Sequence, residues 1–275
     1  MEPEYARQYR DLYTRHWWWR AREEAILEVL RRRVPRNKRL RILDVGCGDG
    51  LFFDRLAEFG DVDGVEPDEA LVDPHGPHRT RIRIAPFDAN FGSPESFDLI
   101  LMLDVLEHLD DPPEALRRAH SLLAPNGALL LTVPAFQLLW TNHDVINHHR
   151  LRYRRATLRP LLNQASFSIL EERYWYQWTC PAKLAIRLVE SVFRRPPAVA
   201  RVPPAWINRP LYWISRTEQR TLGAIGTPFG SSLMVYCAKN LIARTPGAST
   251  PHREFLPRLT RNTFRVPPPV SRSTE

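Results

Sequence analysis

The sequence predicts an α/β fold, a three-layer sandwich around a mostly parallel, seven-stranded sheet, with an N-terminal helix and a helical insertion before the last strand. Two observations lead to this prediction. From Leu40 onward, short apolar runs of strand length alternate with helical patterns, as in βαβ units. A glycine-rich turn follows the first run, at the junction between a strand and the next helix. The expected strands lie at 41–45, 61–66, 81–85, 97–103, 128–133, 167–174 and 231–239.

The N-terminal segment, residues 1–38, is expected to be helical. Apolar side chains at Trp18, Ala25 and Val29 follow the spacing of one helix face. This pattern predicts a helix over Arg15–Arg33, packed on the domain that follows.

The sheet domain is expected over residues 39–240, with an inserted helical cap at about 177–229. Charged and apolar residues separate onto two faces over Ala182–Arg194, which indicates an amphipathic helix. A second helical stretch is expected around Trp206–Ile214, after two Pro-Pro steps. The tail, residues 241–275, is rich in Pro, Arg, Ser and Thr without periodicity, so it is predicted to be disordered.

The composition is that of an ordinary folded protein. The chain has 275 residues, 43% of them hydrophobic and 25% charged, which argues against wholesale disorder, collagen or a coiled coil. The net charge is +8, and only three of the 39 basic residues are lysines. Arginine suits contact with phosphate, carboxylate or anionic lipid, but a GC-rich codon supply explains the same excess.

Cysteine usage and the N-terminus indicate the compartment. Cys47, Cys180 and Cys237 are scattered without CxxC spacing, so we expect neither a disulfide framework nor a cysteine-rich zinc site. The first residues are charged and lack a signal-like apolar region, and turn residues interrupt the longest uncharged stretch. The expected location is the cytoplasm, and the amphipathic helix leaves peripheral contact with a membrane open as an option.

The strongest local signal is the glycine loop Gly46-Cys47-Gly48-Asp49-Gly50, between an apolar strand and a helix. Such a loop lets a ligand approach the backbone, and Glu66, at the end of the next strand, is placed to accept hydrogen bonds from ribose hydroxyls. A dinucleotide site would need glycine at position 51, where Leu51 stands, and Asp44 and Asp49 would repel a pyrophosphate. S-adenosylmethionine carries an ammonium and a sulfonium and no phosphate, so its charge matches these carboxylates.

At these residues the chain resembles the class I, Rossmann-like S-adenosylmethionine-dependent methyltransferases. LDVGCGDG is similar to their first motif. The resemblance continues through Val65-Glu66-Pro67, Phe87-Asp88-Ala89, Phe97–Pro112 and LLAPNGALLLTVP. It covers about residues 40–175 and the last strand.

The resemblance implies S-adenosylmethionine as cofactor and S-adenosylhomocysteine as product. It implies that the loop residues line the methionine end, Glu66 binds the ribose, Asp88 meets the adenine, and Leu103 and Asp104 lie near the sulfonium. A simple turn at Asp88 and a helix cap at Asp104 are the structural alternatives. The implied cofactor-binding residues are Asp44, Gly46, Cys47, Gly48, Glu66, Pro67, Asp88, Ala89 and Leu103.

The acceptor is expected at the loop after the fifth strand, because ligands of open α/β sheets bind at the carboxyl ends of strands. This loop holds His143, His148 and His149. We expect His143, oriented by Asp144, to serve as base, with Asp104 near the reacting atoms. An ordinary polar surface loop is the alternative for these histidines.

No metal is expected, although a minority hypothesis gives Asp104, Glu107 and His108 a divalent ion, as in some relatives that methylate catechol-like quinone precursors. The motifs as a whole predict a methyltransferase acting on a small-molecule or lipid/glycan-like acceptor, with methylation at oxygen.

Two other functions stay open at this point. A nucleic-acid methyltransferase would suit the arginine content, but the Asp/Asn-Pro-Pro-Phe/Tyr signature of amino-methylating relatives is missing after the fourth strand: Pro112-Pro113 is followed by Glu114 and comes too late. No specific nucleic acid is therefore expected as a partner. A non-catalytic S-adenosylmethionine-binding protein is the second alternative. The sequence does not indicate the oligomeric state.

Overall fold

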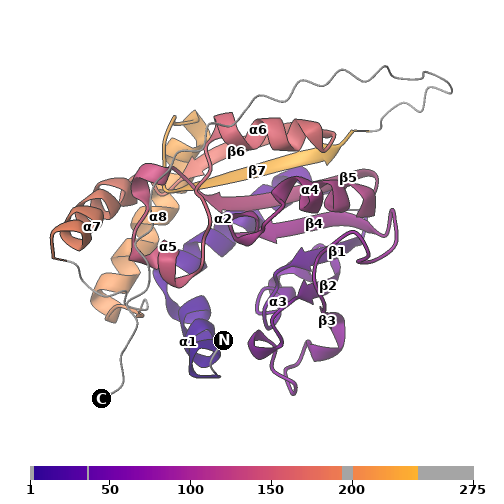
Figure 1. Cartoon of the computed structure of the whole chain (residues 1–275), viewed down its shortest axis with the longest axis horizontal. Helices are drawn as coiled ribbons and strands as arrows, with labels where there is room; N and C mark the ends of the chain where they lie inside the picture. The colour runs from indigo at the N-terminus through magenta and orange to yellow at the C-terminus, as the bar shows by residue number, and fades with distance from the viewer. Residues whose placement is uncertain (1–2, 36, 194–200, 241–275) are drawn as a thin grey trace, which may run out of the picture. The chain divides into compact units, whose positions relative to one another are not determined.

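A seven-stranded sheet forms the centre of the computed structural model, which describes residues 3–35, 37–193 and 201–240. The strand order is β3-β2-β1-β4-β5-β7-β6, and β7 alone runs antiparallel to its neighbours (Figure 1). The strands are β1 Leu40–Val45, β2 Gly60–Glu66, β3 Ile82–Ile84, β4 Phe97–Leu103, β5 Leu123–Pro134, β6 Phe167–Trp175 and β7 Ser232–Lys239. The predicted sheet is confirmed, including its mostly parallel character.

Two apolar cores lie on the two faces of this sheet. On one face, Leu116 of α4 (Pro112–Leu122) and Leu162 of α6 (Arg155–Gln164) are fully buried. On the other face, Leu27 of α2 (Trp17–Arg33) and Leu56 of α3 (Phe53–Leu56) are fully buried. Burial of both faces explains why the strands read as nearly continuous apolar runs. The remaining short elements are η1 Glu69–Leu71, η2 Arg79–Arg81, η3 Leu106–His108, η4 Gln137–Leu139 and α5 Asn142–Ile146.

The N-terminal segment contains two helices where the sequence predicted one. The predicted helix begins at Trp17 rather than Arg15, and a separate helix, α1 (Pro3–Arg15), precedes it. The break occurs at His16, whose backbone is extended and whose Nδ1 accepts a hydrogen bond from the backbone N–H of Trp18 at 3.1 Å. A side chain that caps a helix start in this way satisfies a free backbone donor, so α2 begins there.

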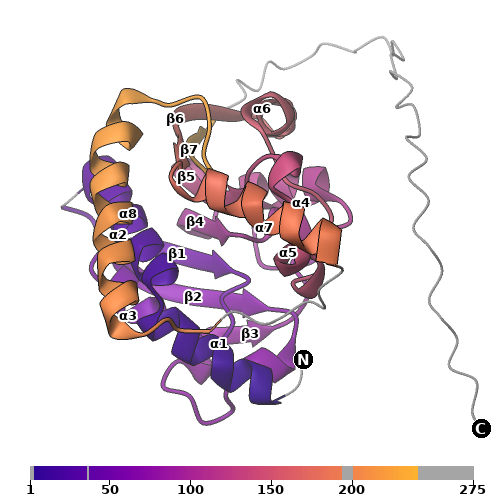
Figure 2. The same ribbon diagram turned by 90° about the vertical axis from the view of Figure 1, so that its left-hand side faces the viewer.

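The helical insertion is confirmed as two helices with different surroundings. The first, α7 (Thr179–Phe193), lies beside α5, whereas α8 (Ala205–Ile225) runs along α2 (Figure 2). The second helix is twice as long as the predicted Trp206–Ile214 stretch, because its buried residues continue to Gln219. The Pro-Pro step at Pro196 and the predicted disordered tail lie outside the described residues.

Two local details interrupt the regular elements. Residues 125–127 are an irregularity inside β5, where Asn126 has a φ of +65° and the pairing with β4 shifts register. Between β1 and β2 only α3 is helical, and turns flank it on both sides. Across the described part of the chain, the helices are too short or too polar to cross a membrane.

Packing of α8 on α2 depends on Arg216. This side chain is only 2% exposed, and its guanidinium pairs with Glu28 of α2 and with Gln219. Arg220 pairs with the same carboxylate at 2.8 Å but is 60% exposed.

We therefore expect Arg216→Met to lower the free energy of unfolding by about 2 to 4 kcal/mol, because Glu28 loses its buried partner. Arg220→Met is the matched control and should cost less than about 1 kcal/mol, since exposed pairs are screened by solvent. Urea denaturation measures both. Equal losses in the two variants would contradict the role given to Arg216.

Candidate functional site

The glycine loop after β1 has the backbone that the sequence predicts. Gly46, Gly48 and Gly50 all have left-handed φ values, of +69°, +53° and +70°. A Cβ on Gly46 would lie 2.9 Å from Cγ2 of Val105, so no larger residue fits there without displacing the loop after β4. The loop therefore stays open to a ligand at backbone level.

Glu66, at the end of β2, closes this loop from the other side. Its carboxylate accepts hydrogen bonds from the backbone N–H of Gly48 at 2.9 Å and of Asp68 at 3.0 Å. The residue is buried, and burial raises the pKa of its carboxyl above the usual range, while the two backbone donors act in the opposite direction. Glu66 thus holds the glycine loop and adds a carboxylate to the same edge of the sheet.

Asp44, at the end of β1, adds a second buried carboxylate. Burial raises its pKa to about 7, nearby Arg22 lowers it, and the charge of Glu66 raises it further. The two carboxylates make this edge a place where a cation is favourable and a phosphate is not.

Asp104 follows β4 and is held by a residue that the sequence did not single out. Its Oδ2 lies 2.8 Å from Nη2 of Arg22, and its Oδ1 accepts a hydrogen bond from the hydroxyl of Thr132. The backbone of Asp104 is in the left-handed region, with a φ of +57°. This conformation and the ion pair fix the carboxylate at the carboxyl ends of β4 and β5.

The other predicted cofactor residues lie around the same edge. Cys47 is half-buried, Pro67 is exposed after β2, and Leu103 is half-buried at the end of β4. Asp88 and Ala89 are exposed beyond β3, and Oδ1 of Asp88 accepts from the backbone N–H of Asn90 at 2.8 Å. That contact forms the turn that was the structural alternative for Asp88, and it leaves the second carboxylate oxygen for another partner.

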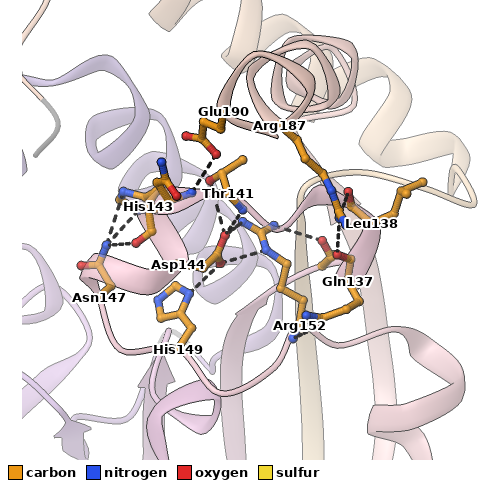
Figure 3. Close-up of polar contacts among 12 residues, drawn as sticks. Gln137, Leu138, Thr141, His143, Asp144, Asn147, His149, Arg152, Arg187 and Glu190 are labelled. Carbon is orange, nitrogen blue, oxygen red and sulfur yellow. Dashed lines mark hydrogen bonds and ion pairs between the residues drawn. The ribbon is translucent and has the colours of Figure 1, made fainter. Parts of the chain in front are cut away.

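The loop after β5 is organised by Asp144, which is completely buried. Its carboxylate forms two hydrogen bonds of 2.9 Å with the guanidinium of Arg152 and one of 2.8 Å with Nδ1 of His149 (Figure 3). It also accepts from the backbone N–H of Thr141. These partners hold the pKa of Asp144 well below its usual range, although burial acts in the opposite direction.

The carboxylate that was expected to orient His143 therefore orients His149 instead. The imidazole nitrogens of His143 lie 3.3 Å from Nδ2 of Asn147. Burial and, after it, the positive charge of Lys183 together lower the pKa of His143 to about 4. This shift favours the neutral form of the ring, although the residue keeps exposed surface.

The histidine loop is tied directly to the loop after β4. The backbone N–H of Arg150 donates to the carbonyl of Glu107 at 2.8 Å, and the hydroxyl of Tyr153 donates to the carbonyl of Leu106. The candidate acceptor loop and the candidate cofactor edge therefore form one continuous site at the carboxyl ends of the strands.

One cluster in this site has donor atoms suited to a metal ion. Glu107, His108 and His149 offer ligand atoms that all lie within 4.8 Å of one another. Both carboxylate oxygens of Glu107 are buried and have no hydrogen-bond partner among the described residues, and burial raises the pKa of this carboxyl. The minority hypothesis named Asp104 together with Glu107 and His108. In the structure Asp104 is paired with Arg22, and His149 is the third residue of the cluster instead.

Sequence reasoning missed two basic residues of the site, Arg22 and Lys183. Arg22 lies on the same face of α2 as Trp18, Ala25 and Val29. A charged residue on an otherwise apolar helix face was therefore visible in the sequence as a candidate for the site. Lys183 belongs to the charged face of the predicted amphipathic helix, and only the packing of this helix beside α5 brings it near Asp144 and Arg152.

A family model described as a methyltransferase domain matches residues 18–172, more than half of the chain. Among curated relatives, a ubiquinone biosynthesis O-methyltransferase of Azorhizobium caulinodans is 37% identical over 119 residues, covering 37% of this chain and 45% of the relative. The protein of that name from Coxiella burnetii is 33% identical over 103 residues, covering 33% and 42%. The chain thus spans less than half the length of the curated relatives it matches.

Solved structures agree in fold at low sequence identity. A possible histamine N-methyltransferase from Thermotoga maritima has a TM-score of 0.54 and 18% identity, covering 86% of this chain and 97% of that one. The cyclase SpnF has a TM-score of 0.52 and 18% identity, covering 81% and 82%. A fold shared with a cyclase does not by itself decide the reaction. Together with the matching family model, the glycine loop and the carboxylate-lined edge show that this chain belongs to the class I S-adenosylmethionine-dependent methyltransferases.

Proposed function

We propose that this protein transfers a methyl group from S-adenosylmethionine to an oxygen of a small-molecule or lipid-like acceptor. The observation that carries the proposal is that the carboxylate-lined glycine loop and the histidine loop lie at the same sheet edge, where the histidine loop is hydrogen-bonded to the loop after β4. The names of the curated relatives, which specify O-methylation, support the choice of oxygen. Their quinone pathway favours a phenol-like acceptor.

The residues at the sheet edge fit the cofactor in charge and shape. Asp44 and Glu66 offer buried carboxylates to its cationic end and its ribose, and Gly46 leaves its backbone uncovered. Arg22 has a buried Nε without a hydrogen-bond partner among the described residues, which suits the carboxylate of a bound amino acid. Cys47, Gly48, Pro67, Asp88, Ala89 and Leu103 complete the proposed cofactor-binding set.

The chain's own contribution to the reaction is alignment and proton removal. Bound S-adenosylmethionine supplies the electrophilic methyl group. The acceptor lies, in this proposal, between Asp104 and the loop held by Asp144, so that its oxygen faces the cofactor. His143 orients the acceptor hydroxyl or takes its proton, and Asp144 positions the loop through Arg152 and His149.

The two alternative functions receive less support. Relatives named for small-molecule O-methylation do not favour a nucleic-acid methyltransferase. A protein that binds S-adenosylmethionine without turnover would not need an acceptor-side loop organised by a buried, multiply hydrogen-bonded carboxylate such as Asp144. Detection of methylated product, with a control for cofactor hydrolysis, separates this alternative from the enzyme.

We further propose a cytoplasmic protein that contacts a membrane surface through α7 and α8. Leu188 and Val192 of α7 are 67% and 71% exposed, and Trp206 of α8 is 76% exposed. Arg201 and Arg209 are exposed near the start of α8. Apolar side chains beside arginines suit an interface with anionic lipid.

Replacing Glu66 by Ala should weaken S-adenosylmethionine binding by about 1 to 3 kcal/mol, because the ribose and the glycine loop lose an acceptor. Isothermal titration calorimetry measures this change. Glu69→Ala, an exposed carboxylate on η1, is the matched control and should leave the affinity unaltered. Unchanged affinity in a folded Glu66→Ala variant would remove Glu66 from the site.

Replacing His143 by Ala should lower the turnover rate while cofactor affinity stays nearly unchanged, because His143 acts on the acceptor side. Loss of proton removal would cost ~10²-fold or more, and loss of orientation alone less. His149→Ala is the informative comparison, since Asp144 orients that ring. Loss of cofactor binding in His143→Ala would place this residue in the wrong half of the site.

Vesicle flotation tests the membrane surface. The protein should float with anionic vesicles at low salt and less with neutral ones, because lipid charge attracts the arginines. The double variant Leu188→Glu/Val192→Glu should lose this binding. Leu170→Glu, at a leucine of β6 that is 50% exposed, should retain it. Flotation that does not depend on lipid would leave α7 and α8 as a cover of the site only.

A further inference from the structure

One face of α7 contacts the acceptor loop. Arg187 donates to the carbonyl of Leu138 at 2.7 Å, and Oε2 of Glu190 accepts from the backbone N–H of Asn142 at 2.9 Å (Figure 3). Residues four apart share a helix face, so Lys183 lies on this face, one turn before Arg187. The same contacts fix α7 against the loop and hold Lys183 in place.

The charge of Lys183 is not paired with any neighbouring residue that the structure describes. Arg152 is paired with Asp144, and Arg150 is paired with Asp110. Among the residues that the structure describes, the ammonium of Lys183 has no hydrogen-bond or ion-pair partner, although the residue is partly buried. A buried amine without a partner is costly unless a ligand or loss of its proton compensates it.

The surroundings of Lys183 bring the pKa of its amine closer to neutral pH. Burial and the positive charge of Arg152, against the opposing effects of Asp144, Cys180 and Asp104, together lower this pKa to about 8. Near neutral pH the amine therefore exchanges its proton readily. The charged and titratable groups that face it are Cys180, Arg187 and Glu190 on its own helix, His143 and Asp144 on α5, Arg152, and Asp104 after β4.

We propose that Lys183 accepts the proton of the acceptor hydroxyl, and that the acceptor is a phenol or an enol held as its oxygen anion. This inference rests on the O-methylation proposed above. The O–H bond breaks as the neutral amine takes the proton, and the electron pair stays on the oxygen. The new ammonium then pairs with that anion. The anion's lone pair would form the bond to the methyl carbon of bound S-adenosylmethionine while the carbon–sulfur bond breaks and its electron pair stays on sulfur. An aliphatic alcohol is too weak an acid for this transfer. His143 keeps the orienting role.

The first test needs no acceptor, because the chain has only three lysines. Competitive labelling with trace acetic anhydride, followed by peptide mass spectrometry, measures the pH at which each amine becomes reactive. In protein saturated with S-adenosylhomocysteine, Lys183 should show a midpoint near 8, well below the usual pKa of a lysine amine. Lys38, which is exposed and paired with Asp98, is the comparison amine in the same sample. An ordinary midpoint for Lys183 would overturn the proposal.

The second test uses 4-nitrocatechol, whose visible spectrum reports the ionisation of its hydroxyl. Bound to the protein saturated with S-adenosylhomocysteine, at a pH below its own pKa, it should show the spectrum of the anion. Lys183→Met should abolish that spectrum, Lys183→Arg should retain it because the cation remains, and the control Lys38→Met should behave as wild type. Unchanged S-adenosylhomocysteine affinity in Lys183→Met shows that the variant is folded. Full ionisation in Lys183→Met would contradict the proposal.

Turnover of the same catechol separates the base from a mere counter-ion. With wild type, kcat/KM should rise with pH to a plateau above about 8, because only the neutral amine accepts a proton. Lys183→Arg should bind the anion and yet lose this rising limb, and a limb centred near 4 would assign the proton to His143 instead. If Lys183 shows the expected labelling midpoint near 8 but no methyl transfer occurs, the result counts against the proposed function and not against the state of Lys183.

Discussion

The buried ion pair between Asp144 and Arg152 is the interaction on which the acceptor side depends. Two charges out of water are stable only if nearly every hydrogen-bonding position is filled, and here the carboxylate receives donors from Arg152, His149 and Thr141. Arg152 also donates to the carbonyl of Ala135, at the end of β5. The loop therefore has one arrangement in which its charges are satisfied, and this arrangement decides where every histidine of the loop points.

Buried charges also lie close together at the cofactor edge, but there the carboxylates outnumber the arginine that pairs with them. Asp44, Glu66 and Asp104 approach one another at the ends of three adjacent strands, and Arg22 pairs directly with one of them. Excess negative charge in a buried place is unfavourable until a cation arrives. The same arrangement that disfavours a pyrophosphate thus favours a ligand with a sulfonium and an ammonium.

The helical insertion serves two separate purposes. Arg216 and its partner Glu28 attach α8 to α2, so this helix is part of the support for the sheet. In contrast, α7 is attached by Arg187 and Glu190 to the acceptor loop itself. One helix therefore stabilises the domain, whereas the other contributes side chains to the site. Because the two helices have separate roles, the methyltransferase fold keeps its support while α7 is free to shape the acceptor region.

The sequence by itself determined the features that depend on neighbours along the chain. Strand runs, the glycine loop and the place of Glu66 follow from local spacing, so the fold class and the cofactor edge could be predicted. Contacts between residues far apart in the sequence could not be predicted in this way. Whether Asp144 orients His143 or His149 depends on how the chain between Asp144 and Arg152 is folded. The partner of Asp104 is Arg22, more than eighty residues earlier in the sequence. Lys183 belongs to a helix whose sequence has a charged face and an apolar face. Only the packing of this helix shows that the charged face lies against the acceptor loop.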